Sequence, residues 1–70
     1  MSQIKILCST HSHNAIALAI RLSGELIEHK VCDRGHILTL GFDKAPFGDS
    51  YKEQFVKAVV LYPEFIEVTP

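Results

Sequence analysis

Helical spacing of apolar residues is clearest in the C-terminal third of the chain. Five side chains fall on one face of a helix: Tyr51, Phe55, Ala58, Val59 and Tyr62. The helix is predicted to begin at Ser50, because Ser50 and Glu53 have the spacing of a capping box, which satisfies free backbone amides. It is predicted to end at about Tyr62, since Pro63 cannot extend the hydrogen-bond ladder. Residues 64–68 are predicted to form a closing strand.

Three earlier stretches have the pattern of strands. Residues 3–8 place three side chains on one side of a strand: Ile4, Ile6 and Cys8. Residues 25–32 and 36–42 flank Asp33-Arg34-Gly35, a turn signal whose glycine can adopt the positive φ of a tight turn. We therefore expect these two stretches to form a β-hairpin.

The hairpin is predicted to pair in a register that separates apolar from polar side chains. When the numbers of paired residues add up to 69, His29 faces Leu40 and Val31 faces Leu38, so that one side of the hairpin is mostly apolar. A shift of one residue would place Lys30 beside Leu38. Because such a shift moves side chains to the wrong side, we expect a connection with an even number of residues.

Residues 13–23 fit two patterns. As a helix, the segment has a broad apolar side and ends at Gly24 in the position of a C-cap. As a strand, it alternates without error, and Ser23-Gly24 would form a hairpin turn. Its three alanines favour the helix, because alanine is the best helix former and is depleted in strands.

The helical alternative gives the order β-α-β-β-α-β, the ferredoxin-like layout, in about the length that this layout needs. The strand alternative gives a four-stranded meander followed by a helix and a final strand. Both are α+β folds. The sequence contains no internal repeat, low-complexity tract or linker, so residues 1–70 are interpreted as a single domain.

The composition is that of a folded domain, and the length makes it a small one. Apolar residues make up 47% of the 70 residues and charged residues 21%, which is too apolar for intrinsic disorder. A chain of this length has a small core, so it folds alone only if that core packs efficiently, or is stabilised by a metal, a disulfide or a partner.

Charge and hydropathy exclude several classes of function. The net charge of −1 provides no field that would attract nucleic acid. The longest apolar run, at residues 15–20, is far shorter than the roughly 20 residues of a membrane helix, and the N-terminus does not resemble a signal peptide. We therefore expect a cytoplasmic protein that binds neither nucleic acid nor membrane, with both cysteines reduced.

Thiol and imidazole side chains follow the first predicted strand. Cys8, His11 and His13 are of the ligand types that zinc and copper prefer, so they are candidate metal ligands. The remaining cysteine and histidines of the chain are His29, Cys32 and His36. The same residues also have an ordinary structural explanation, in which Cys8 belongs to the core and the histidines are solvated.

In the ferredoxin-like alternative, Cys8 to His13 form the loop after the first strand. This layout resembles that of the small heavy-metal-associated domains, whose metal loop lies at the same place. The resemblance is one of topology. Those domains carry Cys-x-x-Cys, whereas His11 stands at the second cysteine position here.

The sequence lacks a catalytic constellation around its first thiol. Cys8 as a nucleophile would need a base and an orienting acid. His11 or His13 could be the base, but no acidic residue precedes Glu25. We therefore predict that the chain is not an enzyme and requires no cofactor.

The predicted C-terminal helix carries two apolar residues away from its aromatic face, Val56 and Val60. An exposed apolar pair on a small domain can mark a contact surface. By elimination, we expect a regulatory, inhibitory or adaptor module that binds a protein partner, with a homo-oligomer as one form of it. A zinc- or copper-binding protein that uses Cys8, His11 and His13 is the alternative.

Overall fold

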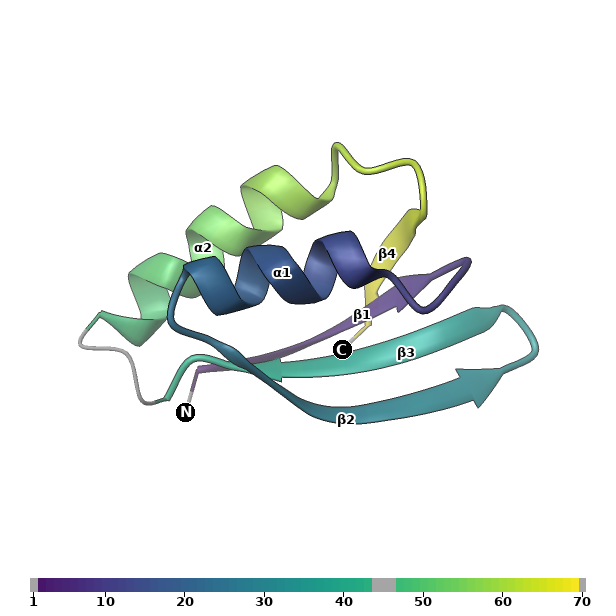
Figure 1. The fold of residues 1–70 in the computed structure, drawn as a ribbon, viewed down its shortest axis with the longest axis horizontal. Helices are drawn as coiled ribbons and strands as arrows, with labels where there is room; N and C mark the ends of the chain where they lie inside the picture. Colours follow the sequence, from purple (N-terminus) through teal and green to yellow (C-terminus); the bar gives the residue numbers. More distant parts are fainter. Residues whose placement is uncertain (1, 44–46, 70) are drawn as a thin grey trace.

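A computed structural model describes residues 2–43 and 47–69. The elements follow in the order β1 (Gln3–Cys8), α1 (His13–Arg21), β2 (Glu25–Cys32), β3 (Gly35–Gly41), α2 (Gly48–Val59) and β4 (Phe65–Thr69). The four-stranded sheet has the order β2-β3-β1-β4, all neighbours are antiparallel, and both helices cover the same face (Figure 1). This confirms the predicted α+β, β-α-β-β-α-β layout. Because α1 is a helix, the meander alternative is wrong.

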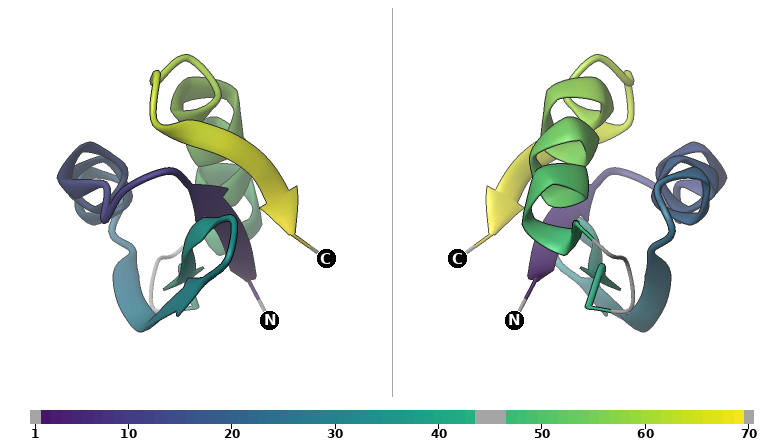
Figure 2. Two further views of the ribbon diagram at one scale, coloured as in Figure 1. Left: turned by 90° about the vertical axis from the view of Figure 1, so that its right-hand side faces the viewer. Right: turned by 90° about the vertical axis from the view of Figure 1, so that its left-hand side faces the viewer.

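The two helices divide the covered face of the sheet between them. Seen end-on in Figure 2, α1 lies over the β2 side and α2 over the β4 side. Nine wholly buried residues form the core beneath them: Ile6, Cys8, Ala15, Ala19, Leu38, Leu40, Phe42, Phe55 and Val59. The rings of Phe42 and Phe55 lie 5.6 Å apart, and Tyr51 and Tyr62 pack against this core from its margin. The apolar face predicted for the C-terminal helix therefore faces the core.

Helix α1 is capped at both ends by local contacts. The Ser12 side chain accepts a hydrogen bond from the backbone N–H of Ala15, 3.1 Å away, which satisfies one free amide of the first turn. At the other end Ser23, not Gly24, adopts the left-handed backbone, with φ of 62°. Gly24 is needed for packing instead, because a Cβ there would lie 2.6 Å from the ring of Phe42. The predicted C-cap role of Gly24 is therefore wrong.

Helix α2 begins earlier than the capping-box pattern predicts. Its N-cap is Phe47, which makes no side-chain capping bond, and Ser50 lies inside the first turn. The Ser50 hydroxyl accepts a bond from the Gln54 side chain, 3.4 Å away, instead of capping the helix. Asp49 provides the negative charge of the first turn, and its carboxylate accepts a hydrogen bond from the Ser2 hydroxyl. This bond holds the pKa of Asp49 below its ordinary range.

Helix α2 also ends earlier than Pro63 alone would require. Its last residue is Val59, not Tyr62. Beyond it the backbone N–H of Leu61 donates to the carbonyl of Ala58 at 3.1 Å, and that of Tyr62 donates to Val59 at 3.0 Å. These bonds reach back three residues instead of four, so the chain tightens before the proline. The closing strand is likewise one residue later than predicted, at Phe65–Thr69.

From Glu28 to Cys32, the β2–β3 hairpin keeps the predicted faces but not the predicted partners. A bulge at Ile27 shifts the rest of β2, so Leu26 pairs with Leu40 and packs against the core in the place predicted for Ile27. His29 pairs with Leu38 and Val31 with His36, so the numbers of paired residues add up to 67 instead of 69. The connection has an even number of residues, as expected, but only two, and β3 begins at Gly35. Gly35 has φ of 142°, and a Cβ on it would lie 2.3 Å from the carbonyl oxygen of Cys8. A glycine thus allows the tighter turn.

Substitutions at Ser23 and Gly24, which follow α1, test the backbone conformation described for the end of this helix. Ser23→Gly should raise the free energy of unfolding by about 1 kcal/mol, because it removes a side chain from a left-handed conformation. Gly24→Ala should lower it by about 1–3 kcal/mol, because the new methyl group would overlap Phe42. Urea denaturation of both variants measures the difference. Destabilisation by Ser23→Gly would contradict the assignment.

Candidate functional site

All four histidines of the chain lie together at one end of the sheet. His11 comes from the β1–α1 loop, His13 begins α1, and His29 and His36 come from β2 and β3. We call these four residues the histidine cluster. It lies where the β1–α1 loop and the β2–β3 turn come close, on the right of Figure 1.

The rings of the cluster are in direct contact. Those of His11 and His29 have centroids 4.3 Å apart and planes 26° apart, which is a stacked arrangement. Nε2 of His29 lies 2.8 Å from Nδ1 of His36, a hydrogen bond in which one nitrogen carries the hydrogen, and the two planes differ by 14°. The His13 ring meets His11 edge-on at 5.1 Å. Three chain segments thus contribute imidazoles to one continuous contact.

Strand register explains why His29 and His36 meet. His29 pairs with Leu38, so His36 is its diagonal neighbour on the same face of the hairpin. In the other direction His36 pairs with Cys8, the last residue of β1, which brings the following loop beside it. The close approach of Gly35 to Cys8 secures this junction.

The loop that carries His11 is fastened by one carboxylate. Glu64 accepts hydrogen bonds from the Ser12 hydroxyl at 2.7 Å and from the Asn14 side chain at 3.2 Å. The backbone carbonyl of Glu64 accepts a further bond from the N–H of Ser9 at 2.8 Å. The bond from Ser12 is the main reason that the pKa of Glu64 lies below its ordinary value. The segment before β4 therefore holds the β1–α1 loop against the sheet.

The structure separates the three metal ligands proposed from sequence. His11, half-buried, and His13, exposed, belong to the histidine cluster. Cys8 is wholly buried in the core, where burial, and then the nearby charge of Glu64, raises the pKa of its thiol. The metal ligation predicted for these residues stays a prediction. His29 and His36 join the cluster through the hairpin pairing. The sequence indicated only that the two residues lie on the same face of the hairpin.

The rings as they stand are not arranged around a metal ion. Among residues 2–43 and 47–69, no three histidine, cysteine or carboxylate side chains have the geometry of a metal site. Partial burial, and then the positive charges that His29, His13 and His36 carry when protonated, lower the pKa of His11. The cluster therefore favours neutral imidazole at His11, which is the form that accepts hydrogen bonds and binds metals.

A second candidate site lies along the outer side of α2. Val56 lines a depression of about 360 Å³ whose other residues are Lys52, Glu53 and Lys57. Val56 also packs against the core, whereas Val60, which sequence reasoning placed beside it, is 47% exposed at the helix end. Of the predicted apolar pair, only Val56 lines this depression.

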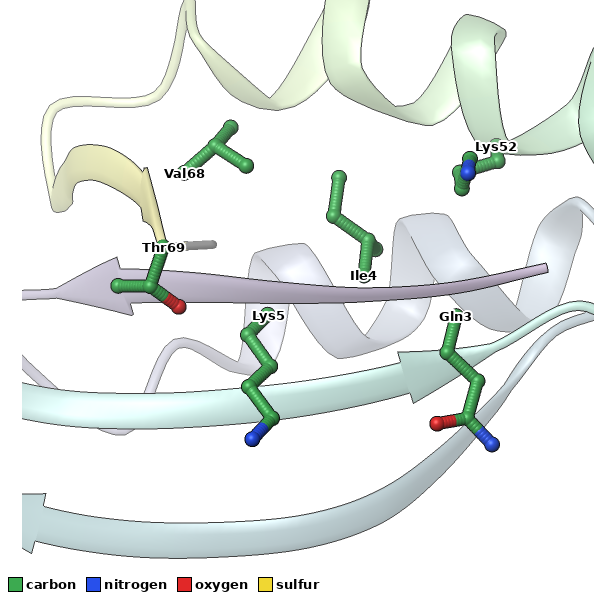
Figure 3. A pocket seen from close by; sticks show the side chains of 6 residues that line it. All are labelled: Gln3, Ile4, Lys5, Lys52, Val68 and Thr69. Atoms are coloured by element: carbon green, nitrogen blue, oxygen red, sulfur yellow. The ribbon is translucent and has the colours of Figure 1, made fainter. Parts of the chain in front are cut away.

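The depression has a neighbour at the edge of β1. The neighbouring pocket, of about 450 Å³, is lined by Gln3, Ile4, Lys5, Lys52, Val68 and Thr69 (Figure 3). Ile4 and Val68 lie on the helix side of β1, and the Lys5 side chain extends on the opposite side. Lys52 lines both hollows. We call the two hollows together the lysine groove.

The lysine groove differs in charge from the rest of this weakly acidic chain. Its apolar lining comes from Ile4, Val56 and Val68, and its charged residues are three lysines and one carboxylate: Lys5, Lys52, Lys57 and Glu53. The ion pairs found within the described part of the chain join Lys30 to Glu28 and Arg34 to Glu67, so they use none of the groove lysines.

Comparisons with known proteins add no function to these sites. No protein-family model, no curated protein and no solved structure matches the chain. Across residues 2–43 and 47–69 we find no helix with the length and apolar character that a membrane span needs.

The two cysteines should differ sharply toward a thiol reagent. Cys32 is an exposed free thiol, whereas Cys8 is a free thiol with no exposed surface and a raised pKa. Because the thiolate is the reactive form, the native protein should consume one equivalent of Ellman's reagent quickly and the second only after unfolding. Cys32→Ser should remove the fast phase. Rapid reaction of that variant in native buffer would contradict the burial of Cys8.

The Glu64 anchor should make stability depend on pH in acid. Because folding lowers the pKa of Glu64 from 4.5, its bonds stabilise the fold above that pH and are lost as the pH falls through the folded pKa. Glu64→Gln should therefore reduce the free energy of unfolding at neutral pH and converge with the wild type at low pH. Urea denaturation across the pH range measures this. Glu53→Gln, on the surface of α2, is the matched control, and an equal effect there would contradict the anchor.

Proposed function

We propose that the chain is a non-enzymatic module that binds an acidic segment of a protein partner in the lysine groove. The observation that carries this proposal is an apolar lining bordered by Lys5, Lys52 and Lys57. A partner with carboxylates beside apolar side chains complements both features. The charges guide the approach and the orientation, and burial of apolar surface supplies affinity.

Both β1 and β4 contribute residues to the groove, which suits an extended ligand. Gln3 and Ile4 come from β1 and Val68 and Thr69 from β4, and the pairing of the two strands among the described residues includes Lys5 with Thr69. The side chains of an extended peptide can enter neighbouring pockets of such a lining.

The opposite edge of the sheet is less suited to this role. β2 carries Glu28 and Lys30, which form an ion pair at 3.5 Å, and a bulge interrupts its pairing beside Ile27. Charged residues and bulges are the usual means by which edge strands avoid further pairing. The asymmetry between the edges favours the lysine groove as the place where a partner docks. The protein nature of that partner and the cytoplasmic setting stay predictions.

Selection from a random peptide library displayed on phage tests the proposal. Peptides selected on the wild type should be rich in Asp and Glu among apolar residues, and their affinity should fall with rising salt. Lys5→Glu together with Lys52→Glu should weaken a selected peptide about tenfold, the effect expected from two exposed charges at roughly 0.5–1 kcal/mol each. Lys30→Glu, on the far edge of the sheet, should leave the affinity unchanged.

Two results would contradict an acidic partner. The first is a selected set without acidic residues, and the second is binding that the paired lysine reversal leaves intact. The remaining possible occupant of the groove is a second copy of this chain. Sedimentation of the protein alone measures whether it forms a dimer. A dimer that Lys5→Glu and Lys52→Glu dissociate would make a second copy of this chain the ligand of the groove.

A further inference from the structure

The histidine cluster brings four imidazole side chains into contact, which solvation alone does not require. Four side chains of one type come from three separate segments and touch in a continuous series, from His13 through His11 and His29 to His36. The lysine groove uses none of them. Neutral imidazole is the commonest protein ligand of transition metals, so a cluster of this kind has a direct chemical use.

We propose that the histidine cluster binds a Zn²⁺ ion, with Nε2 of His29, Nδ1 of His36 and a ring nitrogen of His11 as ligands. The fourth position belongs to His13 or to water. Nitrogen donors of this kind suit zinc and its divalent neighbours, whereas calcium and magnesium require oxygen donors.

The contact between His29 and His36 is close to the geometry that a zinc ion imposes. Their facing nitrogens are 2.8 Å apart with a hydrogen atom between them. Two ligands of a tetrahedral zinc ion, each about 2.0–2.1 Å from the metal, are separated by roughly 3.3 Å. Replacing the hydrogen atom by zinc therefore requires the facing nitrogens to separate by about half an ångström and both rings to tilt toward the ion, because a tetrahedral zinc ion lies off the line between its two ligands. Because both rings are at least partly exposed, solvent has access to this position.

The third ligand requires a turn of the His11 side chain. Its ring is stacked on that of His29 at 4.3 Å, so in the present conformation its nitrogens do not point at the space between His29 and His36. His11 lies half-buried in the loop between β1 and α1 and is not among the core residues, so the proposed turn of its side chain leaves the core packing unchanged. The Ser12–Glu64 bond ties the next residue of this loop to the segment before β4.

Both thiols of the chain are excluded from the proposed site. Cys8 belongs to the buried core, and its raised pKa disfavours the thiolate that a metal would bind. Cys32 pairs with Gly35 three residues after His29, so alternation places it on the other face of the hairpin from His29. The site is therefore an all-nitrogen one, and it differs in its ligands from a cysteine-based metal loop.

Titration of tag-free protein with ZnCl₂ tests this inference. Isothermal calorimetry at neutral pH should give one saturable site, and zinc should raise the midpoint of thermal unfolding, because a ligand that binds only the folded state stabilises it. His29→Gln and His36→Gln should each weaken zinc at least about tenfold. Cys8→Ser and Cys32→Ser should retain the wild-type affinity, and MgCl₂ should produce no heat of binding.

Nitrogen NMR of the imidazoles keeps the test independent of any variant that fails to fold. In the wild type, zinc should shift Nε2 of His29 and Nδ1 of His36, which are different nitrogens of the two rings. Absence of saturable binding at 100-fold excess of zinc over protein would overturn the proposal. Unchanged zinc affinity in folded His29→Gln and His36→Gln variants would also overturn it. The same holds if zinc shifts only nitrogens other than Nε2 of His29 and Nδ1 of His36.

Discussion

The antiparallel pairing of β1 with β3 is the constraint on which the other features depend. These are the two inner strands of the sheet, and their register places Ile6 opposite Leu38 and Cys8 opposite His36. All four side chains consequently project toward the helices. At one end the pairing delivers Phe42 to the core directly after the last pair, and at the other it brings the β2–β3 turn against the end of β1.

Both candidate sites lie where this central pairing stops. At the end of β1, the absence of a side chain on Gly35 lets the turn approach the Cys8 carbonyl, and the histidines meet beside that junction. At the start of β1, Gln3 and Ile4 line the lysine groove together with Val68 and Thr69 of β4. The wholly buried apolar side chains form one small core, and both candidate sites lie outside it, at the ends and edges of the sheet.

Most of the element order could be predicted from periodic patterns, but residues 13–23 fitted both a helix and a strand, and only their three alanines favoured the helix that the structure shows. Strand bounds at residues 3–8 and 25–32 agree with the structure, and Phe55 and Val59 face the core as their spacing indicates. Helix ends were harder to predict because they depend on single contacts. The capping box predicted at Ser50 is not formed. Asp49 accepts a hydrogen bond from Ser2, which is far away in the sequence, and a contact of this kind cannot be recognised from local residue spacing.

Sequence patterning by itself determined the α+β class and the faces of the hairpin from Glu28 to Cys32, because these follow from periodicity, whereas it left residues 13–23 open between helix and strand. Tertiary structure alone decided which residues meet. A shift of two residues keeps each side chain from Glu28 to Cys32 on its face, so alternation could not choose between the two registers, and the structure has the one with the two-residue connection. The β2–β3 pairing placed His36 beside His29, while Cys8 entered the core. Residues that share a chemistry in sequence therefore separated into a buried thiol and an accessible imidazole cluster.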